Sequence, residues 1–132
     1  MSYDVLTNKK SGLDYLHINR GSKTAICILH GYGASMGDLY GLSDMIKLEK
    51  DVDWYFPNGF LDISMGMGAS SRAWFPIDVT VLETAMARGE HRDFSKNYSD
   101  EFDKALQVMQ VFLDDLIINK YDKIILGGFS QG

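Results

Sequence analysis

The residues whose types and spacing could do chemistry are the last five, Gly128-Phe129-Ser130-Gln131-Gly132. A Gly-x-Ser-x-Gly pentapeptide directly after an apolar strand is the pattern of a nucleophile elbow, a tight turn that holds a serine hydroxyl above the end of a sheet. The spacing has a steric cause, because the residues two before and two after the serine pass so close that only small residues avoid a clash. We expect Ser130 to be the nucleophile and to occupy a strained backbone conformation.

A serine hydroxyl is a poor nucleophile unless a base takes its proton and N–H donors hold the charge that develops on the carbonyl oxygen. In an elbow, one such donor is the N–H of the residue after the nucleophile, here Gln131. The second comes from a Gly-rich loop after an earlier strand, and His30-Gly31-Tyr32-Gly33 fits this description. Gly31 and Gly33 let the backbone turn its amides inward, so the Tyr32 N–H is the predicted second donor.

The three histidines, His17, His30 and His91, are the candidates for the base. We expect His30 to support the oxyanion loop instead of accepting the proton of Ser130, and neither His17 nor His91 lies in a segment that makes it a convincing substitute.

The elements that must position these residues alternate between strand and helix patterns, which indicates an α/β sheet. Apolar runs predict strands that are covered on both faces, and apolar spacings of three and four predict helices. The predicted strands are 3–7 and 13–19 as a hairpin, Thr24–Leu29, 52–56 ended by Pro57, and 124–126; the predicted helices start at 38, 80 and 100 and end near 48, 88 and 119.

Residues 58–76 fit no regular element, and a loop of this length in a small domain is usually functional or disordered. Its glycines alternate with Met65 and Met67, whose thioethers adapt to irregular apolar partners. We interpret the segment as an apolar flap beside the active site that repacks around an acyl chain. A loop packed passively on the sheet is the alternative.

The composition of the chain argues against several classes of protein. The 132 residues are 45% hydrophobic, enough for the core of one domain, and a net charge of −5 without a long basic run argues against a nucleic-acid partner. The single cysteine, Cys27, lies in an apolar strand and fits a reducing compartment. With no signal peptide and no apolar run of 18 residues, the expected location is the cytoplasm, with at most peripheral contact with a membrane.

Taken together, these motifs resemble the α/β-hydrolase family of carboxylesterases, lysophospholipases and acyl-protein thioesterases. The resemblance covers residues 23–132 and rests on the His30 loop, Pro57, Ala73-Trp74-Phe75 and the elbow. It implies an α/β-hydrolase fold, with a mostly parallel sheet and helices on both faces. It also implies hydrolysis of acyl esters or thioesters through an acyl-enzyme on Ser130, with oxyanion donors at Tyr32 and Gln131 and without metal or cofactor. Trp74 matches an aromatic near the acyl site, and a core role remains open for it.

Two departures stand out. The family has an acid directly after Trp-Phe, whereas this chain has Pro76 there and Asp78 two residues later. The family's catalytic Asp and His both follow the elbow, so residues 1–132 are expected to be the N-terminal portion of a single hydrolase domain that lacks its C-terminal strands and helices. Without a base, this portion alone is expected to be inactive.

The expected partners are a small acyl-ester or lipid substrate, a membrane surface contacted transiently by residues 58–76, a second copy of the chain, and the remainder of the hydrolase domain. A non-catalytic module that binds lipid or acyl groups is the alternative function. Dinucleotide binding is disfavoured because Met36 replaces the third glycine of Gly-x-Gly-x-x-Gly and no acid ends the next strand.

Overall fold

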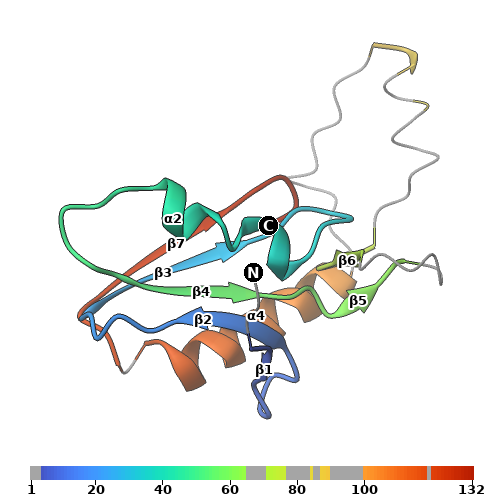
Figure 1. Ribbon diagram of the computed structural model, residues 1–132. Coiled ribbons are helices and arrows are strands. Elements are labelled where there is room, and N and C mark those ends of the chain that lie inside the picture. The colour runs from blue at the N-terminus through green and yellow to red at the C-terminus, as the bar shows by residue number, and fades with distance from the viewer. Residues whose placement is uncertain (1–3, 65–70, 77–83, 85–86, 90–99, 119) are drawn as a thin grey trace.

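A five-stranded mixed sheet forms the centre of the fold (Figure 1). The computed structural model describes residues 4–64, 71–76, 84, 87–89, 100–118 and 120–132. The sheet has the order β1-β2-β4-β3-β7, and its strands are β1 Leu6–Thr7, β2 Asp14–Ile18, β3 Thr24–Leu29, β4 Asp53–Pro57 and β7 Lys123–Gly128. Strands β4, β3 and β7 are parallel, and the predicted N-terminal hairpin is confirmed, with β1 and β2 adding antiparallel pairs.

The parallel register of β3 and β7 brings the two chemically important loops together. Thr24 pairs with Lys123 at one end and Leu29 with Gly128 at the other. Because parallel strands end at the same edge of the sheet, the His30 loop and the Ser130 turn leave this edge side by side.

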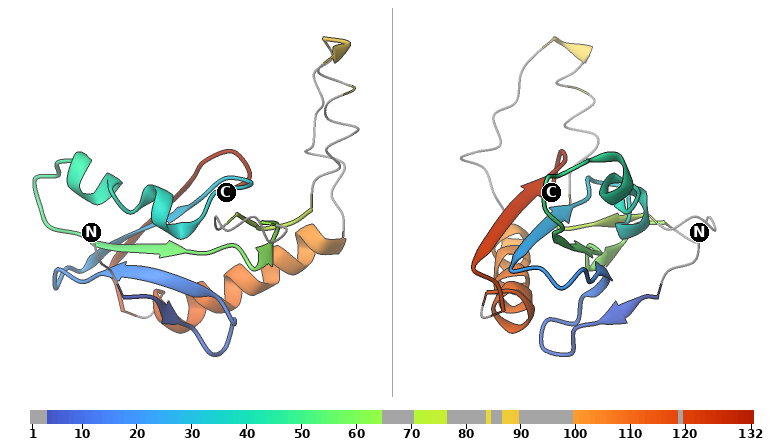
Figure 2. Two further views of the ribbon diagram at one scale, coloured as in Figure 1. Left: turned by 45° about the vertical axis from the view of Figure 1, so that its right-hand side comes forward. Right: turned by 60° about the vertical axis from the view of Figure 1, so that its left-hand side comes forward.

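Helices cover both faces of the sheet, as the α/β interpretation predicts (Figure 2). Alternate residues of β3 face opposite sides: Ala25 and Cys27 pack with the helix α4, Asp100–Leu116, whereas Ile26 packs with the strand residues Trp54 and Phe56. The second cluster is bordered by α1, Met36–Leu39, through Met36 and Leu39. Burial on both sides explains the continuous apolar sequence of β3.

The prediction of one helix from Asp38 to Leu48 is wrong. The structure has two four-residue helices, α1 and α2, the latter spanning Leu42–Met45, and the backbone is already extended at Ile46 (φ −91°, ψ 112°). Gly41 lies between the two helices, and glycine costs about 1 kcal/mol relative to alanine inside a helix. Met45 is consequently 77% exposed, so the apolar spacing does not correspond to a buried face.

The interpretation of 58–76 as free of regular structure also needs correction. Two short strands, β5 Leu61–Asp62 and β6 Arg72–Ala73, pair antiparallel as a separate ribbon. Residues 65–70 lie outside the described residues, and so does most of the predicted helix 80–88. The predicted helix that starts at residue 100 is confirmed as α4, which ends at Leu116.

Candidate active site

Ser130 lies on a strained turn directly after β7. Its φ is +56°, and it is the only residue other than glycine with positive φ in the described part of the chain. A Cβ added to Gly128 would overlap the carbonyl group of Gly132, and a Cβ added to Gly132 would lie 2.7 Å from the carbonyl oxygen of His30. The steric reason for the glycine spacing is thus confirmed. The turn is closed by a hydrogen bond of 2.9 Å from the Gly132 N–H to the Phe129 carbonyl, and Ser130 is exposed.

The loop after β3 contacts this turn through Gly31. A Cβ built on Gly31 would lie 3.2 Å from both the Cβ of Ser130 and the carbonyl oxygen of Phe129. One further bond continues the β3–β7 pairing, from the Phe129 N–H to the Leu29 carbonyl at 3.1 Å. The backbone at Gly31 therefore lies against the candidate nucleophile with little room for a side chain.

Two backbone N–H groups of these loops are open within the described part of the chain. Among the described residues, none accepts a hydrogen bond from the N–H of Tyr32 or of Gln131. Their neighbours differ, because the Gly33 N–H bonds to Arg72 and the Ala34 N–H bonds to Gly31. An N–H pair left open beside a nucleophile is the arrangement that an oxyanion hole requires.

His30 supports the loop with both of its ring nitrogens. Its Nδ1–H donates to the Gly31 carbonyl at 2.7 Å, and its Nε2 accepts from the Gly59 N–H at 2.8 Å. The ring is 1% exposed, and burial lowers its pKa, against the opposing effect of the Gly31 bond. The imidazole is thus held neutral with neither nitrogen free for the proton of Ser130.

The other two histidines are not brought to Ser130. His17 donates its Nδ1–H to the Trp54 carbonyl at 2.9 Å and stacks on Tyr55 in the middle of the sheet. His91 lies outside the described residues. The flap residues Met65 and Met67 lie outside them as well, so their predicted substrate contacts stay predictions.

Trp74 is 5% exposed and packs on the loop after β3. Its indole N–H donates to the His30 carbonyl at 2.9 Å, and its ring stacks on the His30 ring with 5.1 Å between centroids. Of the two roles that the sequence leaves open for Trp74, this buried position favours support of the loop.

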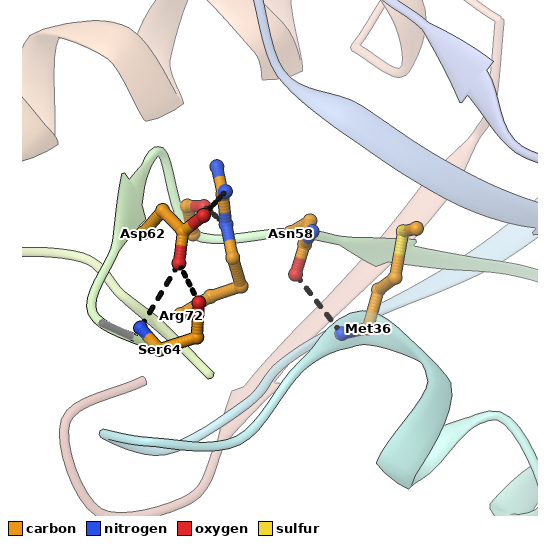
Figure 3. Close-up of polar contacts among 6 residues, drawn as sticks. Met36, Asn58, Asp62, Ser64 and Arg72 are labelled. Carbon is orange, nitrogen blue, oxygen red and sulfur yellow. Dashed lines mark hydrogen bonds and ion pairs between the residues drawn. The ribbon is translucent and has the colours of Figure 1, made fainter. Parts of the chain in front are cut away.

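Arg72 and Asn58 also hold the surrounding loops in place (Figure 3). The sequence interpretation missed both residues. The Nε–H of Arg72 donates to the Gly59 carbonyl at 2.7 Å, and its guanidinium lies 3.9 Å from the Asp62 carboxylate. Asn58 accepts from the Met36 N–H at 3.1 Å, at the start of α1. A signal for Arg72 existed, because Arg72 and Asp62 are the only charged residues between 58 and 76.

The described residues offer no group of three His, Cys, Asp or Glu side chains that could bind a metal ion. Cys27 is fully buried in β3, and burial raises the pKa of its thiol to about 12, so this cysteine is no alternative nucleophile.

A comparison with known families agrees with this geometry. The family model described as Phospholipase/Carboxylesterase matches residues 18–132, from the end of β2 through the Ser130 turn. The chain belongs to this family. It is accordingly an α/β-hydrolase of the phospholipase/carboxylesterase type, and the match includes every element that forms the site.

No curated protein matches this phospholipase/carboxylesterase-family chain. Within the described residues, none of the helices has both the length and the apolar character needed to cross a bilayer.

Proposed function

We propose that Ser130 is the nucleophile of a serine hydrolase that cleaves acyl esters or thioesters through an acyl-enzyme. The observation that carries the proposal is the placement of an exposed serine, on a strained turn, against the Gly31 backbone with two open N–H groups beside it. Family membership supports hydrolysis of this type.

In the proposed reaction, the Oγ of Ser130 attacks the substrate carbonyl carbon while a base removes its proton. The negative charge that develops on the carbonyl oxygen is stabilised by the N–H groups of Tyr32 and Gln131. The tetrahedral intermediate expels an alcohol or thiol, which takes the proton from the base. Water then attacks the acyl-enzyme by the same route, releasing the acid and restoring Ser130.

We propose that the base is a histidine paired with an aspartate, both outside residues 1–132. The support is that His30 uses both ring nitrogens and that His17 bonds to Trp54. His30, Gly31 and Gly33 then support the oxyanion loop without touching the substrate.

A fluorophosphonate tests the nucleophile. The full-length protein is treated with the reagent, its intact mass is measured, and the adduct is mapped by peptide sequencing, with Ser130→Ala as the control. We expect one adduct, on Ser130, and none in the variant. Binding of an acyl chain without any adduct would support the alternative of a non-catalytic lipid-binding module.

The substrate class is proposed from the sequence of the flap. Met65 and Met67 are expected to contact the acyl chain, because thioether side chains repack around apolar ligands of different shape. Replacing both with Ser should lower kcat/KM for long acyl chains more than for acetyl esters. An unchanged preference, measured with a series of p-nitrophenyl esters, would contradict the contact.

A further inference from the structure

The side chain of Gln131 bonds to two consecutive residues of a different segment. Its Oε1 accepts from the Trp74 N–H at 2.9 Å, and its Nε2 donates to the Phe75 carbonyl at 2.7 Å. The side-chain amide therefore bonds to the backbone as a neighbouring strand would, accepting one hydrogen bond and donating another. The backbone N–H of the same residue is one of the two open donors beside Ser130.

Residues 72–75, here called the bridging segment, also bond to the loop that contains Tyr32. The Arg72 N–H donates to the Ala34 carbonyl at 2.8 Å, and the Arg72 carbonyl accepts from the Gly33 N–H at 2.9 Å. The indole bond from Trp74 to His30 anchors the segment on the other side of Tyr32. One short segment thus bonds to both loops that carry the open donors.

The direct connection between the two loops is weaker. The ladder of β3 and β7 ends at Leu29 and Gly128, and one more bond links Phe129 to Leu29. Among the described residues, the hydrogen bonds that connect the loops beyond this point run through the bridging segment. Van der Waals contact at Gly31 sets how closely the loops approach, but it does not orient their N–H groups.

We propose that the Gln131 side chain is a positioning residue that fixes the two oxyanion donors relative to each other through the bridging segment. The inference rests on the proposed function and gives Gln131 a second role beside that of its N–H group. N–H donors that are already oriented toward the developing charge stabilise the transition state more than the bound substrate. Small displacements of these donors reduce that stabilisation. Loss of the two hydrogen bonds of the Gln131 side chain should therefore lower kcat and leave KM nearly unchanged.

Gln131→Met is the first test, because methionine keeps the length of the side chain and the backbone N–H but makes neither hydrogen bond. In the full-length protein, kcat for a p-nitrophenyl ester and the rate of Ser130 phosphonylation should both fall about 10-fold, part of the roughly 100-fold or larger loss that follows removal of a donor. KM should stay within about twofold. Gln107→Met, on the exposed side of α4, is the matched control and should change neither rate.

Gln131→Glu adds a readout that a merely structural role would not give. A protonated carboxyl has one acceptor for the Trp74 N–H and one donor for the Phe75 carbonyl, whereas a carboxylate faces that carbonyl with a negative charge. The ratio of the variant's kcat to that of the wild type should rise as pH falls toward the pKa of the introduced carboxyl. The same ratio for Gln131→Met should be flat.

The outcomes separate this inference from the proposed function. If wild-type Ser130 is labelled and Gln131→Met is labelled equally fast, the positioning role is overturned and the nucleophile stands. If Gln131→Met does not fold, a flat pH ratio for a folded Gln131→Glu overturns the role, and a rising ratio supports it. If wild-type Ser130 forms no adduct, both proposals fail.

Discussion

At the scale of single residues, the site depends on positions where the backbone has little freedom. Ser130 has a φ of +56°, a conformation that costs an L-residue other than glycine about 1 kcal/mol or more. The surrounding contacts at Gly31, Gly128 and Gly132 hold it there. The candidate nucleophile is therefore kept in place at a cost in stability, which substitutions can measure.

Ser130→Gly should be more stable than Ser130→Ala by about 1 kcal/mol, because glycine adopts positive φ without strain and alanine does not. Urea unfolding of the two variants, with the wild type alongside, gives the difference in the free energy of unfolding. Equal stabilities would mean that the turn at Ser130 stores no strain.

Gly31→Ala should slow phosphonylation of Ser130 about 10-fold, because the added Cβ would lie 3.2 Å from the Ser130 Cβ and would push the turn away. Gly41→Ala is the matched control, since a Cβ at Gly41 meets nothing within 4 Å. Labelling rates with a fluorophosphonate compare the two variants directly. A similar rate in both would show that the approach of Gly31 is unimportant for reactivity.

At the scale of elements, Asp53 at the start of β4 ties three segments together. Its carboxylate accepts from the N–H groups of Arg20 at 2.7 Å and Ser22 at 3.2 Å, in the turn before β3, and from the Tyr121 hydroxyl at 2.6 Å, before β7. Tyr55 donates in turn to the Tyr121 oxygen at 2.8 Å. These bonds fix the ends of β3, β4 and β7 opposite to the site and so support their register.

Asp53→Asn should destabilise the fold by about 2 kcal/mol at pH 7, the usual value for hydrogen bonds to a charged group. Burial alone would raise the pKa of Asp53, but the bonds from Tyr121, Arg20 and Ser22 outweigh it and lower the pKa. The stabilisation is therefore present above the unfolded value of 3.8 and is lost as pH falls below it.

Urea unfolding at pH 7 and pH 3 tests this dependence. The difference between wild type and Asp53→Asn should shrink at pH 3, and the exposed neighbour Asp51→Asn serves as the control. A difference that is the same at both pH values would show that the charge of Asp53 contributes nothing.

The sequence predicted the elements whose burial is set by a simple pattern. β3 begins and ends at the predicted residues, because its five consecutive apolar side chains, which follow Thr24, are typical of a strand covered on both faces. The ribbon of β5 and β6 was missed because two-residue strands are too short to show a period, and their pairing depends on contacts with the loop after β3. Similarly, the helix prediction after Asp38 failed because the spacing of apolar residues took no account of Gly41, where the first helix has ended and the second begins.

For the site, the motifs identified Ser130, Tyr32 and Gln131 as candidates, because glycine spacing reports on local backbone geometry. The role of the Gln131 side chain could not be predicted, since its partners Trp74 and Phe75 are more than fifty residues away in sequence. Contacts of this kind depend on the tertiary structure.

At the scale of the whole molecule, the sheet is covered unevenly. The interior strands are buried on both faces, whereas β7 pairs only with β3 among the described strands and exposes Ile125 by 43% and Leu126 by 55%. An exposed apolar edge strand presents unpaired backbone groups to other chains and favours association. The behaviour of the 132 residues in solution should therefore depend on this edge.

Leu126→Lys should reduce concentration-dependent association of the 132-residue chain more than Leu106→Lys does. The two leucines are equally exposed, at 55%, but Leu126 lies on the edge strand and Leu106 on α4, where backbone groups are already bonded. Static light scattering over a concentration series compares the variants at the same net charge. An equal reduction would assign association to general apolar exposure instead of the strand edge.

The register of β3 against β7 has a consequence for the order of folding. Gly31 and Ser130 meet only after the chain has closed the loop between these two strands, which includes β4, the ribbon and α4. Contacts between residues so distant in sequence form late, because the entropy of loop closure must first be overcome. During synthesis and early folding, Ser130 is thus an ordinary serine, and its reactivity should appear only when the sheet is assembled.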